Sequence, residues 1–244
     1  MPEVHPTPRT VLVAGATGRT GRLVVVIAQG VGLYVRGLTS DPAKEQQLRE
    51  LGVDEIIVGD LLDPETAPRA AAGMDAVVST VGAKDREPGR ERIFTDGVTQ
   101  LIDAVRAGDT AHLVLLTSLG VGRSAEAVQP AFRAARGPIL AAMDRAEERL
   151  RGSGLPYTIV RPGRLTDEDA THDVLVGEGG TAIGSGSIPR ADVARILVAT
   201  LLTPEARDRT FEILSRAGAR TAPGATVTVP WRFGTTAWTL PDAR

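Results

Sequence analysis

The sequence predicts an α/β fold in which a doubly wound parallel sheet carries helices on both faces. Short apolar, strand-like runs alternate with helix-length segments along most of the 244 residues. This alternation is typical of parallel sheets that are covered on both sides. A glycine-rich turn follows the first run, where a strand hands over to a helix. The strand-like runs are residues 10–14, 32–38, 54–59, 75–80, 112–118, 156–162 and 210–214.

The first helix is predicted over a segment that resembles a strand in composition. Residues 23–27 read LVVVI, and β-branched residues favour strands. Parallel neighbours, however, need a crossover connection, and only this segment joins residues 10–14 to residues 32–38. Burial against a sheet overrides weak helix propensity. We therefore expect a helix here.

The later helices carry start and stop signals. Asp41-Pro42 and Asp63-Pro64 are pairs of a capping residue and a first-turn proline. Glycines fall where helices are expected to end, at Gly30, Gly52, Gly73 and Gly108.

Two irregular segments are predicted to wall a substrate cleft. Residues 119–138 begin irregularly, become weakly helical, and follow the carboxyl end of a strand, where open α/β sheets bind ligands. Residues 163–189 are rich in glycine and are expected to form the opposite wall. Together they predict a small substrate lobe within one domain, residues 10–218. Residues 1–9 read as a mobile leader. Residues 219–244 read as a tail that packs on its own domain or on a second copy of the chain.

Composition narrows the function classes. The chain has no cysteine, which excludes disulfides and thiol chemistry, and no His/Asp/Glu cluster has metal-ligand spacing. A net charge of −2 gives no reason to expect nucleic acid as a partner. No apolar run approaches the ~18 residues of a membrane span, and no signal peptide pattern is present. These features predict a cytoplasmic protein that acts on a small molecule.

The glycine turn predicts a dinucleotide site. Gly15, Gly18 and Gly21 are spaced three residues apart between a strand and a helix. Such glycines serve a tight turn, close approach of the backbone to a diphosphate, and close packing of helix on strand. The helix start adds unpaired N–H donors and a partial positive charge.

Several further motifs, in order, resemble one known family. They are TVLVAGATGRTG, IVGDLLDP, VVSTVG, LLTSLGVG, AEERLRGSGLPYTIVRPGRL and IPRADVARILVATLL, and they extend from residue 10 to about residue 214. The chain resembles the atypical short-chain dehydrogenase/reductase superfamily, in its NAD(P)H-binding, NmrA-like branch, which includes flavin and biliverdin reductases. The resemblance implies a Rossmann-like fold.

The resemblance also implies roles for particular residues. Asp60 and Leu61 match the pair that flanks adenine, although Asp60 alone also suits a turn cap. Arg161, Pro162 and Gly163 match a loop that closes over the nicotinamide, although Arg161 equally suits a structural ion pair. The remaining matches are Gly15, Thr17, Gly18, Arg19 and Thr20 at the diphosphate, Ser79, Thr80, Val81 and Gly82 at the ribose, and Thr117 and Ser118 beside the nicotinamide.

The end of the second strand favours NADP over NAD. An NAD site places an acidic residue about 20 positions past the glycines, for the ribose 2′-hydroxyl. Here the first acid is Asp41, which suits a helix cap. Relatives that favour NADPH often carry arginine at the position of Ser40. Arg19, Ser40 and Lys44 nevertheless offer donors and positive charge for a 2′-phosphate.

One expected pair of catalytic residues is missing. Most short-chain reductases use a Tyr-x-x-x-Lys pair as proton donor, but Leu38 and Arg161 stand four residues after Tyr34 and Tyr157. Many relatives of this branch keep a lysine where this chain has Met143. A positioned general acid contributes about 10²–10⁴ in rate, so simple ketone reduction is expected to be slow.

Conjugated acceptors escape this requirement. Hydride addition to a quinone or flavin gives a delocalised, phenol-like anion. The conjugate acid of this anion has a pKa near the ~10 of tyrosine, so water can supply the proton. The sequence therefore predicts an NADPH-dependent reductase of conjugated aromatic acceptors. A dinucleotide-binding redox sensor without turnover, and a carbonyl reductase with an unusual acid, remain alternatives. Candidate proton donors are Ser118, which equally suits holding the nicotinamide amide, Asp144, which better suits a solvated helix face, and His172, a loop histidine of a kind that more often has no catalytic role.

Overall fold

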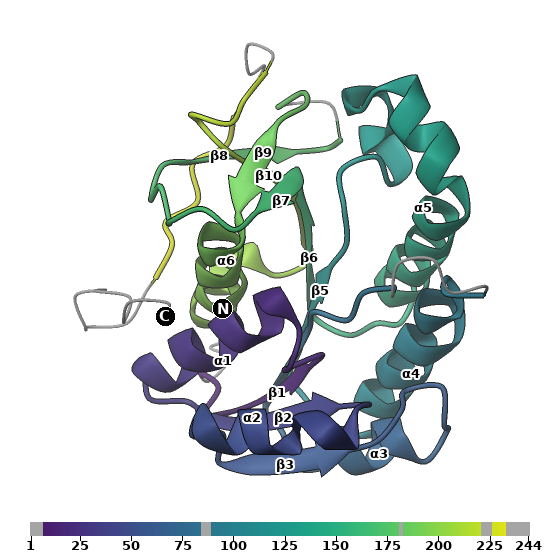
Figure 1. Cartoon of the computed structure of the whole chain (residues 1–244), viewed down its shortest axis with the longest axis vertical. Coiled ribbons are helices and arrows are strands. Elements are labelled where there is room, and N and C mark those ends of the chain that lie inside the picture. The colour runs from purple at the N-terminus through teal and green to yellow at the C-terminus, as the bar shows by residue number, and fades with distance from the viewer. Residues whose placement is uncertain (1–6, 84–88, 181–182, 221–225, 233–244) are drawn as a thin grey trace.

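An eight-stranded sheet lies at the centre of the computed structural model, which describes residues 7–83, 89–180, 183–220 and 226–232 (Figure 1). The strand order is β3-β2-β1-β4-β5-β6-β10-β8. All neighbours are parallel except β8, which runs antiparallel to β10. The bounds are β1 Thr10–Ala14, β2 Tyr34–Thr39, β3 Glu55–Val58, β4 Ala76–Ser79, β5 His112–Leu116, β6 Tyr157–Pro162, β8 Val174–Glu178 and β10 Arg209–Ser215.

The order of the strands reverses direction at β1. The chain proceeds outward from β1 through β2 to β3, and then returns to place β4 on the other side of β1. Val13 is accordingly paired with Gly37 of β2 and with Val78 of β4. A reversal of this kind opens a crevice at the carboxyl ends of the two inner strands, where open α/β sheets bind ligands.

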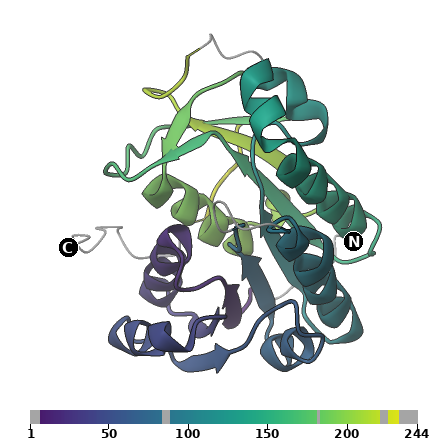
Figure 2. The same ribbon diagram turned by 45° about the vertical axis from the view of Figure 1, so that its right-hand side comes forward.

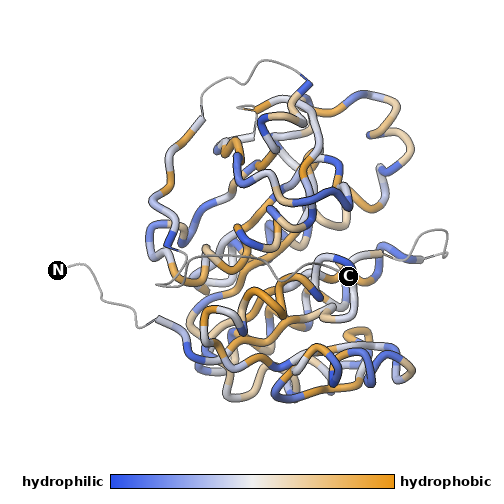
Figure 3. The backbone as a smooth tube through the Cα atoms, turned by 60° about the vertical axis from the view of Figure 1, so that its left-hand side comes forward, coloured by the Kyte–Doolittle hydropathy of each residue, from blue (hydrophilic) through white to orange (hydrophobic). Residues whose placement is uncertain are grey.

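Helices cover both faces of the sheet (Figures 1 and 2). Because successive side chains of a strand point to opposite faces, β1 divides between two cores: Val11 and Val13 join one, Leu12 and Ala14 the other. Figure 3 shows apolar stretches of the tube along these inner elements. The first core contains α1 (Arg19–Gly30), α2 (Glu45–Glu50) and α6 (Arg190–Leu202); the second contains α3 (Thr66–Ala71), α4 (Thr99–Ala107) and α5 (Pro130–Arg151).

The strand-like segment 23–27 is helical, as predicted. It lies within α1, and Val24, Val25 and Ile27 are buried in the first core. Burial against the sheet thus outweighs the strand propensity of these residues.

The predicted helix starts are partly shifted. Asp41 Oδ1 accepts from the Ala43 N–H at 3.0 Å and opens a single turn, residues 42–44, ahead of α2. Asp63 Oδ1 accepts from the Glu65 N–H at 3.1 Å, but α3 begins only at Thr66. Asp63-Pro64 therefore forms a turn that precedes the helix.

Residues 163–189 are more regular than the sequence indicated. They contain β8 and two short strands, β7 (Arg164–Thr166) and β9 (Ser187–Pro189), which pair in parallel as a separate sheet. Strands this short, separated by glycines, carry little periodicity, so no pattern in the sequence predicted them. Residues 119–138 contain a 3₁₀ turn at 122–127 and then the start of α5. The two segments touch, because a Cβ on Gly180 would lie 2.3 Å from the Arg123 Cβ.

The described parts of the tail, residues 219–220 and 226–232, pack on their own chain. The Val227 N–H donates to the Val176 carbonyl at 2.9 Å, and Val229 is buried. The Trp231 ring meets Phe211 edge-on, with centroids 5.5 Å apart. The rest of the tail, residues 221–225 and 233–244, and the leader residues 1–6 lie outside the described residues. None of the described helices combines the length and the apolar character needed to cross a membrane.

Candidate functional site

The glycine turn lies between β1 and α1, at the carboxyl edge of the sheet. The N–H groups of Gly15 and Ala16 donate to the Leu38 carbonyl at 3.2 and 3.1 Å, which ties the turn to β2. Gly15 has φ +80°, a conformation that favours glycine. A Cβ on Gly21 would lie 2.1 Å from the Gly15 oxygen, so helix and turn meet without room for a side chain.

The start of α1 presents backbone donors. Its first internal hydrogen bond runs from the Arg22 N–H to the Gly18 carbonyl at 2.9 Å. Helix geometry leaves the preceding N–H groups, at residues 19–21, without intrahelical acceptors. Gly18 caps the helix through its backbone alone, with no side-chain hydrogen bond. Donors of this kind, with the positive end of the helix dipole, suit a phosphate.

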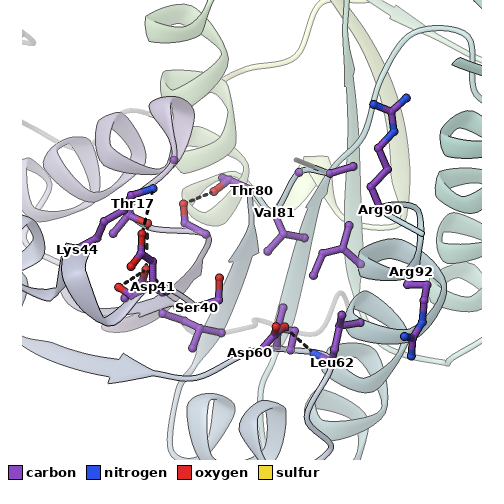
Figure 4. A pocket seen from close by; sticks show the side chains of 18 of the residues that line it. Thr17, Ser40, Asp41, Lys44, Asp60, Leu62, Thr80, Val81, Arg90 and Arg92 are labelled. Atoms are coloured by element: carbon purple, nitrogen blue, oxygen red, sulfur yellow. Dashed lines mark hydrogen bonds and ion pairs between the residues drawn. The ribbon is translucent and has the colours of Figure 1, made fainter. Parts of the chain in front are cut away.

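A cavity of about 410 Å³ opens beside this turn (Figure 4). Its volume lies within the range of small-molecule sites. It is lined by ten residues that the sequence assigned to a cofactor: Gly15, Thr17, Gly18, Ser40, Lys44, Asp60, Leu61, Thr80, Val81 and Gly82. The lining does not include Arg19, Thr20, Gly21, Ser79, Thr117, Arg161, Pro162 or Gly163. These lie in or beside the glycine turn and at the ends of β4, β5 and β6.

One wall of the cavity is polar. Thr17 Oγ1 lies 3.1 Å from Thr39 Oγ1, which accepts from the Asp41 N–H at 3.2 Å. The Lys44 Nζ lies 3.7 Å from Asp41 Oδ2. Asp41 therefore combines two tasks: it caps the turn at 42–44, as the sequence predicted, and it also lines the cavity.

Asp60 likewise has two tasks. Its Oδ1 accepts from the Leu62 N–H at 2.9 Å, so it stabilises the turn after β3, and it lines the cavity as well. Both roles that the sequence left open are thus compatible. The neighbouring Leu61 is 3% exposed and packs against Gly97, where a Cβ would lie 3.1 Å from the Leu61 Cβ.

The opposite wall was missed by the sequence analysis. Arg90 and Arg92 lie across the cavity from Lys44 (Figure 4), and Ile93 also lines the cavity. Residues 93–98 form a π-helix ahead of α4, an uncommon geometry that occurs often at functional sites. Arg92 pairs with Asp96 at 2.9 Å; the Thr95 hydroxyl and then Arg92 lower the pKa of Asp96. The sequence could have indicated these residues only by their position, because they are in the segment after β4, and β4 lies where the strand order reverses. The other missed lining residues are Leu38, Thr39, Asp41, Leu62, Ala83 and Gly89.

A buried ionic cluster lies at the ends of β5 and β6 and beside the middle of β10. Arg161, 3% exposed, donates from Nε to Glu147 Oε1 at 3.0 Å and from Nη1 to Glu212 Oε1 at 3.3 Å. The Thr117 hydroxyl donates to Glu147 Oε1 at 2.8 Å. Burial alone would lower the pKa of Arg161, but Glu147 and Glu212 outweigh it and raise that pKa. The structural ion pair that the sequence offered as one role for Arg161 is present.

Glu212 links this cluster to the loop after β8. Its Oε2 accepts from the Gly180 N–H at 3.3 Å. Burial raises the pKa of Glu212, against the opposing effects of Arg161 and of the Gly180 N–H.

The three candidate proton donors do not converge. Ser118 donates to the Leu119 carbonyl at 2.9 Å. Asp144 approaches the ionic cluster: its Oδ1 and the Arg161 Nη2 both lie 3.0 Å from the position of a Cβ on Gly122. His172 is exposed on the loop between β7 and β8, and its ring contacts Arg195 of α6. None of the three lines the cavity.

Both tyrosines begin strands, at the edge of the sheet opposite the cavity. Tyr34 is the first residue of β2 and Tyr157 the first of β6. Neither can supply a phenol at the carboxyl edge, so position as well as spacing excludes a Tyr-x-x-x-Lys pair. Within the described residues, no group of three or more His, Asp or Glu side chains is arranged to hold a metal ion.

Comparison with known proteins agrees with this geometry. A family model described as NAD(P)H-binding matches residues 15–204. An uncharacterized chloroplastic protein of Arabidopsis thaliana is 32% identical over 233 residues, which cover 86% of this chain and 70% of that one. The sanguinarine reductase of Eschscholzia californica is 29% identical over 248 residues, 85% of this chain and 89% of the reductase.

A solved structure shares the fold as well. A putative NAD-dependent epimerase/dehydratase from Bacillus halodurans superposes with a TM-score of 0.76 at 27% identity, over 85% of this chain and 94% of that one. The family model spans both the glycine turn and the ends of β4, β5 and β6. The chain therefore belongs to the NAD(P)H-binding family, as its motifs predicted.

Proposed function

We propose that this protein is an NADPH-dependent reductase that passes hydride to a conjugated aromatic acceptor of the quinone or flavin type. Family membership and the similarity to a protein named sanguinarine reductase support a nicotinamide-dependent reduction. The glycine turn is the observation that carries the proposal, because Gly15 and Gly18 line the cavity and Gly21 lets the start of α1 pack directly against the turn.

The residues of the cavity fit a dinucleotide. The first N–H groups of α1 would hold the diphosphate, and Asp60 with Val81 would flank the adenosine. Ser40 and Lys44 would meet a 2′-phosphate at the end of β2. Thr117 and Arg161 would position the far end of the cofactor from the buried cluster. Bound NADPH supplies the hydride.

The acceptor class follows from the missing proton donor. Tyr34 and Tyr157 lie at the wrong edge of the sheet, and Met143 stands where many relatives keep lysine. A conjugated acceptor tolerates this, since its reduced form is a delocalised anion that water protonates. Positioning of two reactants and exclusion of water then account for the acceleration.

The direct test is NADPH oxidation across a panel of quinones and flavins, beside aldehydes and sugars. We expect turnover with the conjugated acceptors and little with the others. Tight NADPH binding without turnover anywhere on the panel would favour a redox sensor instead. Preferential turnover of aldehydes, lost on substitution of Ser118, Asp144 or His172, would favour a carbonyl reductase with an unusual acid.

The choice of cofactor has its own test. Lys44→Ala should weaken NADPH binding about 3- to 10-fold, because it removes a positively charged group that would contact the 2′-phosphate. NADH lacks that phosphate, so its binding should stay nearly unchanged. Lys44 is half exposed and pairs only loosely with Asp41, so the fold should tolerate the change. Calorimetric titration with both reduced cofactors measures the ratio. An equal loss for NADPH and NADH would contradict the assignment of Lys44.

A further inference from the structure

Two arginines from different helices share one carboxylate. Arg19 is the first residue of α1, and Arg190 is the first residue of α6. The two helices pack side by side (Figure 1). Asp167, in the loop after β7, accepts from Arg19 Nη1 at 2.7 Å through Oδ2 and from Arg190 Nη1 at 2.5 Å through Oδ1. Both guanidinium groups thus converge on a single anion.

This arrangement carries an excess of positive charge. The Arg190 side chain is 11% exposed, whereas those of Arg19 and Asp167 are 63% and 61% exposed. Burial and then the charge of Arg19 lower the pKa of Arg190, while Asp167 raises it. Arginine stays protonated in proteins, so a buried guanidinium requires an anionic partner. The starts of two helices add partial positive charge nearby.

Another anion can displace the Asp167 carboxylate from the two arginines with little loss of stability. An exposed carboxylate in an ion pair contributes only modestly to stability. The far end of its loop is fixed independently, because Asp192 of α6 accepts from the Thr171 N–H at 2.8 Å and from the His172 N–H at 3.0 Å. Asp167 could therefore leave the two arginines while the loop stays attached to α6.

The position of the arginines suggests what replaces Asp167. Arg19 directly follows Gly18 of the glycine turn, and Arg190 directly follows β9 in the segment expected to wall the substrate cleft. We propose that Arg19 and Arg190 form an oxyanion subsite for a phosphate or carboxylate substituent of the acceptor, which Asp167 occupies in the free protein. This inference rests on the proposed function and makes its acceptor an anionic one.

The experiment compares two acceptors with the same reactive ring. Riboflavin is neutral, and riboflavin 5′-phosphate adds a phosphate away from the isoalloxazine. The dissociation constant of each is measured by quenching of flavin fluorescence on the full chain saturated with NADP⁺, so that the cofactor phosphates are already in place. The ratio of the two constants is the readout, and NADPH-driven reduction of riboflavin is followed separately.

Two substitutions move the ratio in opposite directions. Asp167→Asn removes the internal competitor and should tighten binding of the phosphorylated flavin about 2- to 5-fold relative to riboflavin. Arg190→Gln should weaken it about 10-fold or more relative to riboflavin. Asp103→Asn is the matched control: Asp103 pairs with Arg149 at 2.6 Å, is similarly exposed, and lies on α4. It should leave the ratio unchanged.

Each outcome of the binding and reduction assays supports or overturns one of the two proposals. If Asp167→Asn leaves the ratio at the value of Asp103→Asn, the subsite is refuted, and this variant suffices if Arg190→Gln fails to fold. Binding of neither flavin would overturn the subsite, and the quinone panel would then decide the reductase on its own. A shifted ratio without NADPH-driven reduction of riboflavin or of any quinone on the panel would support the subsite and contradict the reductase. Reduction with an unshifted ratio would support the reductase and overturn the subsite.

Discussion

At the scale of single residues, Gly21 sets how closely α1 approaches the glycine turn. A Cβ there would lie 2.1 Å from the Gly15 oxygen and 2.9 Å from the Thr80 Oγ1. Thr80 itself donates to the Ala14 carbonyl at 3.0 Å, so it cannot retreat without loss of that bond. Only glycine at position 21 therefore allows the start of α1 to pack against the glycine turn and the end of β4.

Gly21→Ala should therefore lower the free energy of unfolding by about 1–3 kcal/mol, the usual range for overpacking, and weaken NADPH binding as the turn shifts. Urea denaturation and calorimetric titration measure the two effects. Gly30→Ala is the control, since a Cβ at Gly30 would meet no atom within 4 Å at the end of the same helix. Equal behaviour of the two variants would contradict the close-packing role of Gly21.

The spacing of the glycines was enough to predict this turn, because local backbone geometry requires a glycine at each of these positions. Arg90 and Arg92 show the limit. They line the cavity only because the π-helix at 93–98 and the end of β4 bring them opposite β2. No motif marks them, since the contact joins segments about 50 residues apart in the chain. The sequence likewise could not predict that Arg19 and Arg190 share the Asp167 carboxylate.

At the scale of elements, the buried cluster joins three of them. Arg161 of β6 pairs with Glu147 of α5 and with Glu212 of β10. Glu147 is fully saturated, because the Thr117 hydroxyl, Arg161 and Arg151 all donate to it. Glu212 has fewer donors, and burial raises its pKa.

Glu212 should make stability depend on pH. Its pKa in the folded protein lies above the value of 4.5 expected for an unfolded chain. Folding is thus favoured by its protonated form, and this contribution is fully present below about pH 4.5 and is lost as pH rises through the raised pKa. In Glu212→Gln the side chain stays neutral. The stability of the variant relative to wild type should therefore increase with rising pH.

Urea denaturation across a pH series measures that difference. Glu205→Gln is the control, since Glu205 is exposed and pairs with Arg232 at 3.0 Å. A stability of Glu212→Gln relative to wild type that decreases as pH rises would contradict the raised pKa.

The tail is the second element whose role the structure clarifies. Trp231 meets the Phe211 ring edge-on at 5.5 Å, and the Arg232 N–H donates to Thr203 Oγ1 at 2.9 Å. Residues 226–232 therefore contact their own domain, which is one of the two positions that the sequence allowed for the tail. Pattern analysis could not choose, since the tail lacks the periodicity of a helix or strand.

Trp231→Ala should destabilise the fold by about 2 kcal/mol, less than a fully buried tryptophan, because the ring is only half buried. Phe132→Ala, at a side chain that is 41% exposed on α5, should change stability by at most about 0.5 kcal/mol. Urea denaturation compares the two. Similar small losses would mean that the tail contributes little to the stability of the domain.

At the scale of the whole molecule, the doubly wound sheet follows from the alternation of apolar runs and helix-length segments. All seven runs became strands of one sheet, and LVVVI became a helix because the topology required a crossover there. The strands that the sequence missed, β7, β8 and β9, belong to the segment after β6. Their pairing depends on partners elsewhere in the chain, and β8 pairs with β10 more than 30 residues later.

Cofactor binding should stabilise the molecule as a whole. Binding to the native state alone adds about 2.7 kcal/mol at a hundredfold excess over Kd. For a chain of this size that corresponds to a rise in Tm of roughly 5–10 °C. Differential scanning fluorimetry with NADPH and NADP⁺ measures the rise. No shift with either nucleotide, at concentrations where calorimetry detects binding, would contradict a single cooperative unit around the site.

The hydrogen bond from Val227 to Val176 has a consequence for self-association. β8 is one of the two edge strands of the sheet, and an edge strand with apolar side chains is a template onto which another polypeptide can add. The tail covers part of that template, at Val176 of β8. A chain truncated before residue 226 would lose this shield, and fibril-like or dimeric stacking through β8 is the expected result.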